Sequence, residues 1–181
     1  ILPFIARHAH MVGYSFVQSA EDVRFLQEKL ASLDRIDLGI ILKIETKKSF
    51  RHLPELLLQA MQNPKVGVMI ARGDLAIEMG WERIAEVQEQ IAWLCEAAHI
   101  PYIWATQVLE NLAKTGQATR AEITDAAMAV RAECAMLNKG PFILEAVKTL
   151  QDLDQRMDAH HYKKMASLRP LQVAVRFWDK N

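Results

Sequence analysis

The stretch Val68–Leu75, Val-Met-Ile-Ala-Arg-Gly-Asp-Leu, joins a short apolar run to an arginine, a glycine and an aspartate. An uninterrupted apolar run of this length is typical of a strand buried on both faces of a parallel sheet. Parallel α/β folds bind their ligands at the carboxyl ends of such strands, where the last residues of this stretch lie. Taken alone, the octet is equally compatible with a strand that ends in a solvated Gly-Asp turn.

Alternating strands and helices are predicted on both sides of this octet. Further apolar runs predict strands at residues 11–17, 38–45, 101–107 and 134–137. Apolar residues at helical spacing predict helices at about residues 19–30, 48–62, 81–99, 119–131 and 142–165, with a short helix after residue 107. This repetition implies parallel strands joined by right-handed crossovers, so we predict an α/β fold.

The predicted strands also recur at a regular distance. They begin near residues 11, 38, 66, 101 and 134, so successive starts differ by 27, 28, 35 and 33 residues. This is the spacing of a parallel β/α barrel of the TIM type, whose eight units occupy roughly 250 residues. Since five units cannot close such a barrel, we predict either an open five-stranded sheet or an incomplete barrel with about five of eight β/α units.

The composition is that of an ordinary globular domain. Of the 181 residues, 51% are hydrophobic and 24% charged, and the formal net charge is zero at pH 7. We therefore predict no nucleic-acid partner. No apolar run approaches the roughly 20 residues that span a bilayer, and residues 1–16 lack a signal-peptide pattern, so we predict no membrane association. The start at Ile1 indicates a fragment, a processed product or an excised domain.

The cysteines and histidines form no metal-binding motif. Cys95 and Cys134 lie far apart, each among apolar residues, and we predict buried free thiols in a reducing compartment. His8 and His10, like the pair at residues 160–161, have neither cysteine partners nor a zinc-binding frame. These side chains are therefore not expected to hold a metal ion.

Polar side chains and one glycine lie at or just past the carboxyl ends of four of the five predicted strands. They are Ser15, Lys43, Glu45, Arg72, Gly73, Asp74, Thr106 and Gln107. In a parallel sheet the carboxyl ends of the strands lie along one edge, so these residues are expected to converge. Lys43 and Glu45 are two residues apart and should point to the same side of their strand.

These residue types suit a metal-assisted reaction. Two carboxylates can hold Mg²⁺, which needs few protein oxygens besides water and substrate. A lysine beside such an ion would stabilise a transferring phosphoryl group or an enolate. The alternative is an ion pair between Lys43 and Glu45 that serves no ligand.

Five short motifs occur in the order and spacing of a known enzyme family. They are Ser15–Val17 (Ser-Phe-Val), Lys43–Glu45 (Lys-Ile-Glu), Ile70–Leu75 (Ile-Ala-Arg-Gly-Asp-Leu), Ala105–Glu110 (Ala-Thr-Gln-Val-Leu-Glu) and Thr119–Glu122 (Thr-Arg-Ala-Glu). Together they resemble the pyruvate kinase family, over about residues 1–150. The resemblance implies a cytoplasmic enzyme of glycolysis, whose barrel transfers phosphate from phosphoenolpyruvate to ADP and gives pyruvate and ATP.

The resemblance also implies roles for individual residues. Lys43 would be catalytic, stabilising the moving phosphoryl group and the enolate oxygen. Glu45 and Asp74 would bind the divalent metal, Mg²⁺ or Mn²⁺. The family also uses K⁺, but its site is not expected in this chain.

A carboxylate site for the substrate is implied as well. Arg72, Gly73, Asp74 and Thr106 would bind substrate, and its carboxylate would be held by the backbone of Arg72 and Gly73 together with the Thr106 hydroxyl. Thr106 would also be catalytic. Three further candidates for the same site are Ser15, Gln107 and Asn138.

The chain also departs from the family pattern. The family's first three barrel strands, which supply a phosphate-binding arginine, the K⁺ site and nucleotide contacts, have no counterpart here, nor have its lid and regulatory domains. After the fifth strand the family reads Leu-Ser-Gly-Glu-Thr-Ala-Lys-Gly, whereas this chain reads Leu137-Asn138-Lys139-Gly140, about four residues fewer. Asn138 replaces a serine linked to proton delivery, and an amide cannot relay a proton as a hydroxyl can.

The end of the chain is not explained by the resemblance. We predict a partial barrel over residues 1–166 and a tail of unknown role over residues 167–181. Residues 171–177 alternate like a strand, and an incomplete barrel exposes strand edges that invite pairing. The tail would either cover such an edge, pair with another chain, or form a loose C-terminus.

The expected function is that of a pyruvate kinase part with little or no activity alone. Its expected partners are phosphoenolpyruvate or pyruvate, ADP or ATP, and either further copies of itself in a homo-oligomer or the missing N-terminal half of the barrel. Two alternatives remain open. One is another metal-dependent enzyme of the phosphoenolpyruvate/pyruvate type, and the other is a non-catalytic assembly module.

Overall fold

The computed structural model describes residues 1–158 of the chain. Within this range one parallel sheet contains, in chain order, β1 (Met11–Tyr14), β2 (Gly39–Ile44), β3 (Val66–Ala71), β4 (Tyr102–Val108) and β5 (Cys134–Leu137). Each strand runs parallel to the next. The predicted parallel α/β fold is therefore confirmed, and the arrangement is consistent with part of a β/α barrel.

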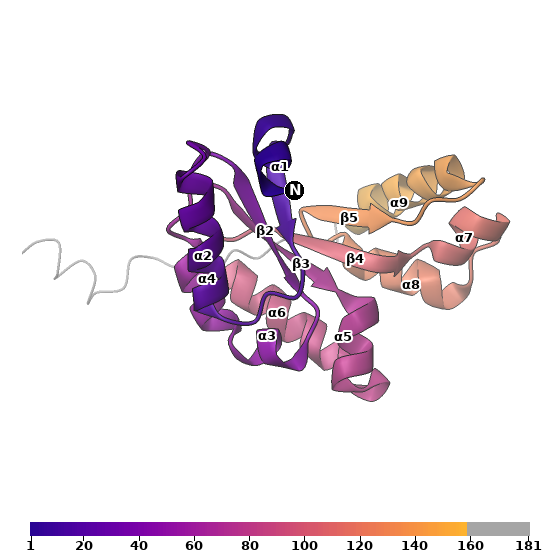
Figure 1. Cartoon of the computed structure of the whole chain (residues 1–181). Coiled ribbons are helices and arrows are strands. Elements are labelled where there is room, and N and C mark those ends of the chain that lie inside the picture. The colour runs from indigo at the N-terminus through magenta and orange to yellow at the C-terminus, as the bar shows by residue number, and fades with distance from the viewer. Residues whose placement is uncertain (159–181) are drawn as a thin grey trace, which may run out of the picture.

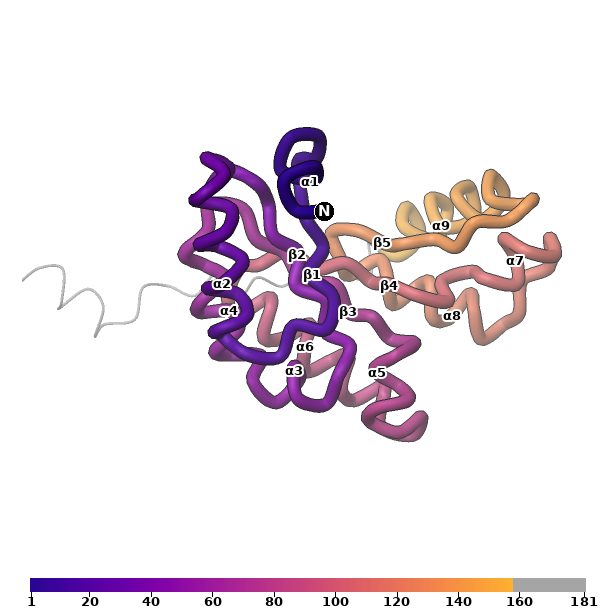
Figure 2. Tube along the Cα trace, viewed as in Figure 1, coloured from indigo at the N-terminus to yellow at the C-terminus, as the bar shows by residue number. Residues whose placement is uncertain are grey.

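Helices precede, connect and follow the strands (Figure 1). They are α1 (Leu2–His8), α2 (Ala20–Ala31), α3 (Lys47–Arg51), α4 (Leu53–Ala60), α5 (Arg72–Met79), α6 (Ile84–Ala98), α7 (Glu110–Thr115), α8 (Arg120–Ala129) and α9 (Ile143–Asp158), with a 3₁₀ turn at Trp81–Arg83. Helix α2 packs beside α4, and α9 packs against both α7 and α8. The tube in Figure 2 shows how the chain returns after each helical connection to place the next strand beside the previous one.

The end of the chain carries predictions that lie outside the described residues. The last predicted helix is described as α9, up to Asp158. The boundary at residue 166 and the predicted strand at residues 171–177 fall beyond it. Both remain predictions.

The hydrophobic core lies against one face of the sheet. On β2, Ile40, Leu42 and Ile44 are fully buried, whereas Ile41 and Lys43 between them are only half-buried. Because successive side chains of a strand point to opposite faces, the helices bury the first set and leave the second set on the other face.

The other face of the sheet is partly open to solvent within the described residues. Met11 on β1 and Met136 on β5 are exposed, and Met69 and Ile103 on the central strands are half-buried. Strands β1 and β5 form the two edges of the sheet, and neither has an outer partner strand among residues 1–158. In a closed β/α barrel this inner face would be filled by layers of side chains.

The first strand is shorter than the sequence predicts. The predicted strand over residues 11–17 ends at Tyr14, because Ser15 and Phe16 form a turn. Phe16 there has a φ of 54°, in the left-handed region. The turn redirects the Phe16 N–H toward β2, which matters for the site described below.

The helix predicted over residues 48–62 is divided in two. Pro54 lies in the first turn of α4, after α3 has ended at Arg51. Proline has no N–H to donate and its ring clashes with the preceding turn, so it ends a helix that would otherwise continue. Met61, which lies within the predicted range, follows the end of α4 and is exposed.

Side-chain caps begin three of the helices. Ser19, Thr46 and Thr119 each accept a hydrogen bond from a backbone N–H in the first turn of α2, α3 and α8, and in each case a side chain three residues later bonds back. The helices predicted from about residues 19 and 119 thus begin at these caps. Such capping boxes satisfy N–H groups that have no acceptor within the helix.

The cap of α2 makes its stability dependent on pH. Burial would raise the pKa of Asp22, but the N–H groups of Gln18 and Ser19, each 2.9 Å from Oδ2, hold that pKa below its ordinary value of 3.8. A carboxyl group whose folded pKa is depressed stabilises the fold above its unfolded pKa, and this contribution is lost as pH falls through the folded value. Asp22→Asn is therefore expected to lower the free energy of unfolding by about 1 kcal/mol near neutral pH.

Urea unfolding of the wild type and of Asp22→Asn at several pH values measures this effect. The difference between the two proteins should narrow as pH falls from about 5 toward and below the folded pKa. Glu21→Gln is the control, because Glu21 lies in the same turn but pairs only with exposed Arg24. A difference between wild type and Asp22→Asn that stays constant over this pH range would contradict the assignment.

Candidate active site

The first group of predicted site residues gathers where β2 ends. Lys43 Nζ lies 2.8 Å from Glu45 Oε1 and donates a hydrogen bond of 3.0 Å to Ser15 Oγ. Glu45 Oε2 accepts a 2.6 Å hydrogen bond from the N–H of Phe16, in the turn after β1. The expected same-side orientation of Lys43 and Glu45 is confirmed. We call Ser15, Phe16, Lys43 and Glu45 the lysine cluster.

The lysine cluster combines a buried anion with a reachable cation. Glu45 is 2% exposed, whereas the Lys43 side chain is 26% exposed. A buried carboxylate needs partners, and here an ammonium and a backbone N–H supply them. Lys43 remains accessible from the open face, where a compact ammonium can meet an anionic ligand.

The second group forms between the ends of β3 and β4. Helix α5 begins directly at Arg72, so the Arg-Gly-Asp segment is the first turn of a helix and not a solvated turn. The Gly73 N–H donates a 2.9 Å hydrogen bond to Thr106 Oγ1. Within an α-helix the first N–H groups have no intrahelical acceptor, so this N–H is available for Thr106 or for a ligand.

The Arg72 side chain turns back under β4 and does not face solvent. Its Nε donates to Ala105 O at 3.0 Å, its Nη2 donates to Thr106 O at 2.5 Å, and its Nη1 forms an ion pair with Asp125. Its guanidinium lies over the ring of Trp104, 4.8 Å from the centroid. We call Arg72, Trp104, Thr106 and Asp125 the arginine cluster.

The end of β4 has an unusual backbone. Thr106, Gln107 and Leu109 have φ values of 67°, 59° and 48°, in the left-handed region. The pairing with β5 shifts register between Trp104 and Val108. Left-handed backbone is costly for a β-branched residue such as threonine, and bulges of this kind re-aim side chains next to sites.

Three predicted site residues make fewer contacts. Asp74 in the first turn of α5 and Gln107 in the bulge of β4 are exposed, and Asn138 directly after β5 is half-buried. Among residues 1–158 their side chains form no hydrogen bond or ion pair. The structure therefore brings together Ser15, Lys43 and Glu45, and separately Arg72, Gly73 and Thr106, at the carboxyl ends of neighbouring strands.

Three contributors were not predicted from the sequence. They are the Phe16 N–H, Trp104 and Asp125. The sequence could have predicted that Arg72 has an anionic partner, because an arginine at the end of a buried strand requires one. Nothing local to residue 125 distinguished it from the other acidic residues.

The oxygen donors suit a divalent metal that is shared with a substrate. Glu45 and Asp74 offer carboxylate oxygens, and Mg²⁺ is typically held by one or two carboxylates together with water and substrate oxygens. Within the described part of the chain no group of three or more His, Cys, Asp or Glu side chains could hold a metal ion. The residues therefore fit a metal with few protein ligands and do not fit an all-protein cage.

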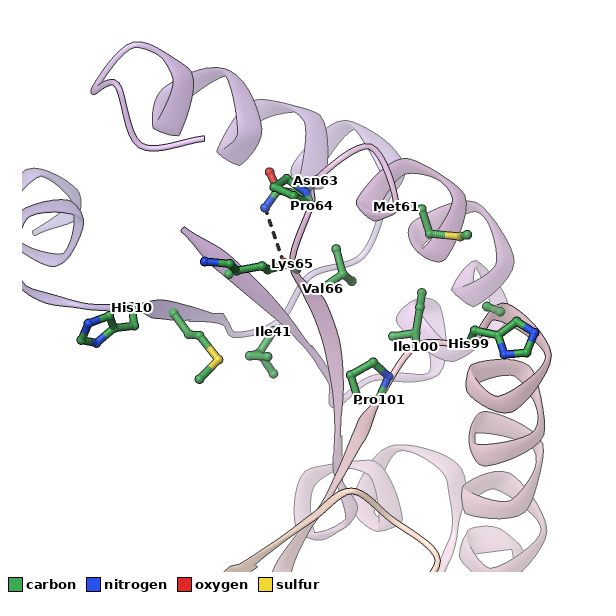
Figure 3. A pocket seen from close by; sticks show the side chains of 13 residues that line it. His10, Ile41, Met61, Asn63, Pro64, Lys65, Val66, His99, Ile100 and Pro101 are labelled. Carbon is green, nitrogen blue, oxygen red and sulfur yellow. Dashed lines mark hydrogen bonds between the residues drawn. The ribbon is translucent and has the colours of Figure 1, made fainter. Parts of the chain in front are cut away.

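A cavity of about 650 Å³ lies at the opposite end of the sheet (Figure 3). His10, Lys65 and Pro101, which directly precede β1, β3 and β4, line it, as does Met11 on the open face. Asn63 donates there to the carbonyl of Lys65. No member of the lysine or arginine cluster lines this cavity. In β/α barrels the amino-terminal face of the sheet serves stability, so we do not place the active site there.

Both cysteines were predicted to be buried, and the structure confirms this for Cys95 but not for Cys134. Cys95 is buried, and desolvation raises its pKa to about 12, so it is not reactive near neutral pH. Cys134 is exposed, so the prediction that it is buried was wrong. It begins an edge strand and alternates with Ala135, which packs against the core, so it belongs to the open face.

The described residues contain no helix that is both long and apolar enough to cross a bilayer.

Fold and site together define an α/β protein of the β/α-barrel class, with lysine, carboxylate and hydroxyl groups at the carboxyl ends of its strands. Sequence comparison matches residues 2–147 to the family described as "Pyruvate kinase, barrel domain". The chain therefore belongs to the pyruvate kinase family.

Individual relatives support the same conclusion. The chain is 38% identical over 151 residues to the pyruvate kinase of Kluyveromyces lactis, covering 79% of this chain and 28% of that protein. It is 31% identical over 182 residues to the pyruvate kinase of Bacillus licheniformis, covering 97% of this chain and 30% of that protein. It is also 32% identical over 186 residues to the pyruvate kinase of Dictyostelium discoideum, covering 94% of this chain and 36% of that protein. The chain thus spans about a third or less of the length of these relatives.

Proposed function

We propose that this chain contributes one wall of a pyruvate kinase active site, the wall that binds the enolpyruvate part of phosphoenolpyruvate together with Mg²⁺ or Mn²⁺. The reaction would transfer phosphate to ADP and give pyruvate and ATP, as a cytoplasmic step of glycolysis. The observation that supports this best is the pairing of Lys43 with Glu45 beside the Gly73–Thr106 contact, on neighbouring strand ends. A cation, hard oxygens and paired donors are what phosphoryl transfer requires.

Lys43 would act on the charge that moves during the reaction. Its ammonium is held by Ser15 Oγ and Glu45 Oε1, so it is oriented before a ligand arrives. A fixed cation of this kind stabilises negative charge on a transferring phosphoryl group and on an enolate oxygen. Glu45 and Asp74 would hold the metal, which would supply further Lewis-acid stabilisation.

Gly73 and Thr106 would hold the substrate carboxylate. In the structure the Gly73 N–H donates to Thr106 Oγ1 at 2.9 Å. A carboxylate placed between them would accept from both the N–H and the hydroxyl, and charge-assisted hydrogen bonds of this type are stronger than the neutral bond they replace. Gln107 and Asn138 are secondary candidates at the same edge of the sheet.

The proposal does not require that the chain act alone. A phosphate-binding arginine, the K⁺ site and the nucleotide contacts belong to motifs that this sequence does not contain. We therefore expect no turnover of phosphoenolpyruvate with ADP by the 181 residues, and we expect the missing barrel units, or a homo-oligomer, to complete the site. The open inner face and the two free edges of the sheet within residues 1–158 support this expectation.

Calorimetric titration of the chain with oxalate, an enolpyruvate mimic, tests the proposal in the presence and absence of Mg²⁺. Binding that depends on Mg²⁺ is expected. Absence of binding would favour the non-catalytic assembly module, and activity on a pyruvate-derived substrate without ADP would favour another enzyme class. Turnover of phosphoenolpyruvate with ADP by the isolated chain would contradict the expected inactivity.

Gly73→Ala is expected to affect ligand binding at this position without lowering the stability of the fold. A Cβ there would lie 3.6–3.9 Å from Thr106, in ordinary contact, so the fold has room for it. Because alanine favours a helix over glycine, the free energy of unfolding should stay the same or rise by about 0.5 kcal/mol. The methyl group would nevertheless occupy the space of the carboxylate, so oxalate affinity should fall by about tenfold or more.

Urea unfolding and calorimetry of the same variant measure the two effects. Gly140→Ala is the contrasting variant, since its Cβ would lie 2.1 Å from Ala113 O and must displace backbone. That variant should lose stability. A Gly73→Ala protein with unchanged oxalate affinity would exclude a carboxylate at this N–H.

A further inference from the structure

We propose that Asp125 is a positioning residue for the carboxylate site. It acts through Arg72, which fixes the backbone that carries Thr106. The inference deepens the proposed function and rests on it for the identity of the ligand.

Asp125 lies on α8, far from Arg72 in the sequence. Asp125 forms its ion pair with Arg72 across 53 residues of chain. Arg72 is 9% exposed, and a guanidinium buried to this extent is stable only with an anion or several acceptors. Asp125 therefore supplies the charge that keeps this side chain beneath β4 and away from solvent.

The planar guanidinium then bonds to the bulged strand end. Arg72 donates from Nε to Ala105 O and from Nη2 to Thr106 O, while the Trp104 ring supports its face. The donors of a guanidinium are fixed in one fork, so fixing Nη1 on Asp125 also sets the directions of the other two. The carbonyl groups of Ala105 and Thr106 are thereby held in fixed positions relative to Asp125.

Holding these carbonyls matters because the backbone between them is strained. Thr106 and Gln107 have left-handed φ values, a conformation that is costly for a β-branched residue such as threonine. Such a conformation persists only where its surroundings enforce it. Without the Arg72 bonds, Thr106 is expected to relax, and its hydroxyl would leave the Gly73 N–H.

The Gly73 N–H offers a direct readout of this chain of contacts. It lies in the first turn of α5, where it has no intrahelical acceptor, and its partner is Thr106 Oγ1. Its hydrogen-exchange protection, measured by NMR on the full 181-residue chain without ligand, therefore reports on the position of the threonine hydroxyl. Asp125→Asn is expected to lower this protection by about tenfold and to weaken Mg²⁺-dependent oxalate binding by a similar factor.

Asp152→Asn is the matched control. Asp152 also pairs with an arginine, Arg156, at 2.7 Å, but on the exposed surface of α9. Its replacement should leave both the Gly73 amide and oxalate binding unchanged. Asp125→Glu keeps the charge and should restore most of the protection that Asp125→Asn loses.

A purely structural role for Asp125 predicts a different result. The thermal midpoint of Asp125→Asn would then fall, while Gly73 exchange and oxalate affinity in the folded protein would stay at wild-type values, and this outcome would overturn the proposal. If Asp125→Asn does not fold, Arg72→Lys tests the same step, because it keeps a cation for Asp125 but removes the donors to the two carbonyls. Unchanged Gly73 protection in that variant would overturn the proposal as well.

The proposed function and the positioning role of Asp125 can be tested separately. If the wild-type chain binds no oxalate with Mg²⁺, the proposed function is wrong at this site. The exchange of the Gly73 amide, which needs no ligand, still decides whether Asp125 positions Thr106.

Discussion

Glu45→Gln is expected to weaken Mg²⁺-dependent oxalate binding by about 100-fold or more, because it removes one of the two negative charges offered to the metal. The substitution keeps the size of the side chain. Glu45 is 2% exposed, and an amide in its place can still accept the Phe16 N–H, which lies 2.6 Å from Oε2 in the wild type. The loss should therefore reflect charge and not misfolding.

The measurement is a calorimetric titration of oxalate into the chain at saturating Mg²⁺. Glu78→Gln is the control, since Glu78 is an exposed carboxylate on α5 that accepts a hydrogen bond from the Lys47 N–H. Its replacement should change the affinity less than about twofold, as expected for a surface substitution. A Glu45→Gln protein that binds as tightly as the wild type would show that Glu45 is only the ion-pair partner of Lys43.

Trp104→Ala is expected to lower the free energy of unfolding by about 3–5 kcal/mol. Trp104 is 1% exposed and is among the largest fully buried side chains. Its loss would open a cavity between β4 and the helices and would remove the ring that supports the Arg72 guanidinium. This is the largest stability effect that we predict for a single substitution.

Trp104→Phe should cost much less, about 1 kcal/mol. The indole Nε1 is buried, and it has no hydrogen-bond partner among residues 1–158. Removing an unsatisfied N–H recovers its desolvation cost, which offsets part of the lost volume. The alanine variant recovers the same desolvation cost, but it loses far more volume, so its cavity dominates the change in stability.

Urea unfolding at equilibrium measures both substitutions. Trp93→Ala is the control, since Trp93 is 59% exposed and should change stability by less than about 0.5 kcal/mol. A phenylalanine variant as unstable as the alanine variant would contradict the assignment of an unsatisfied N–H.

The order of strands and helices could be predicted from the sequence because periodicity is a local property. Apolar runs such as residues 68–71 and the helical spacing of Val23, Leu26 and Leu30 predict burial without knowledge of the neighbours. The pairing of Lys43 with Glu45 was predictable for the same reason, since both lie on one strand. Pro54, whose effect is also local, would have predicted the break between α3 and α4.

The arginine cluster could not be predicted in this way. Asp125 meets Arg72 only because α8 packs against β4, and Arg72 in turn donates to the carbonyl of Thr106 in the bulge. Cys134 shows the same limit, because apolar neighbours in the sequence do not tell which face of an edge strand a side chain occupies. Long-range packing decides such details, whereas the local pattern decides the elements.

The strict chain order of the sheet has a consequence for how the protein is made. Within residues 1–158 every strand pairs only with strands adjacent to it in the chain, so each pairing closes a loop of roughly 30 residues and carries a modest entropic cost. A ribosome releases the units in the same order in which they pair. Each completed strand can therefore serve as the template for the next while synthesis continues, so that assembly resembles the growth of a linear array.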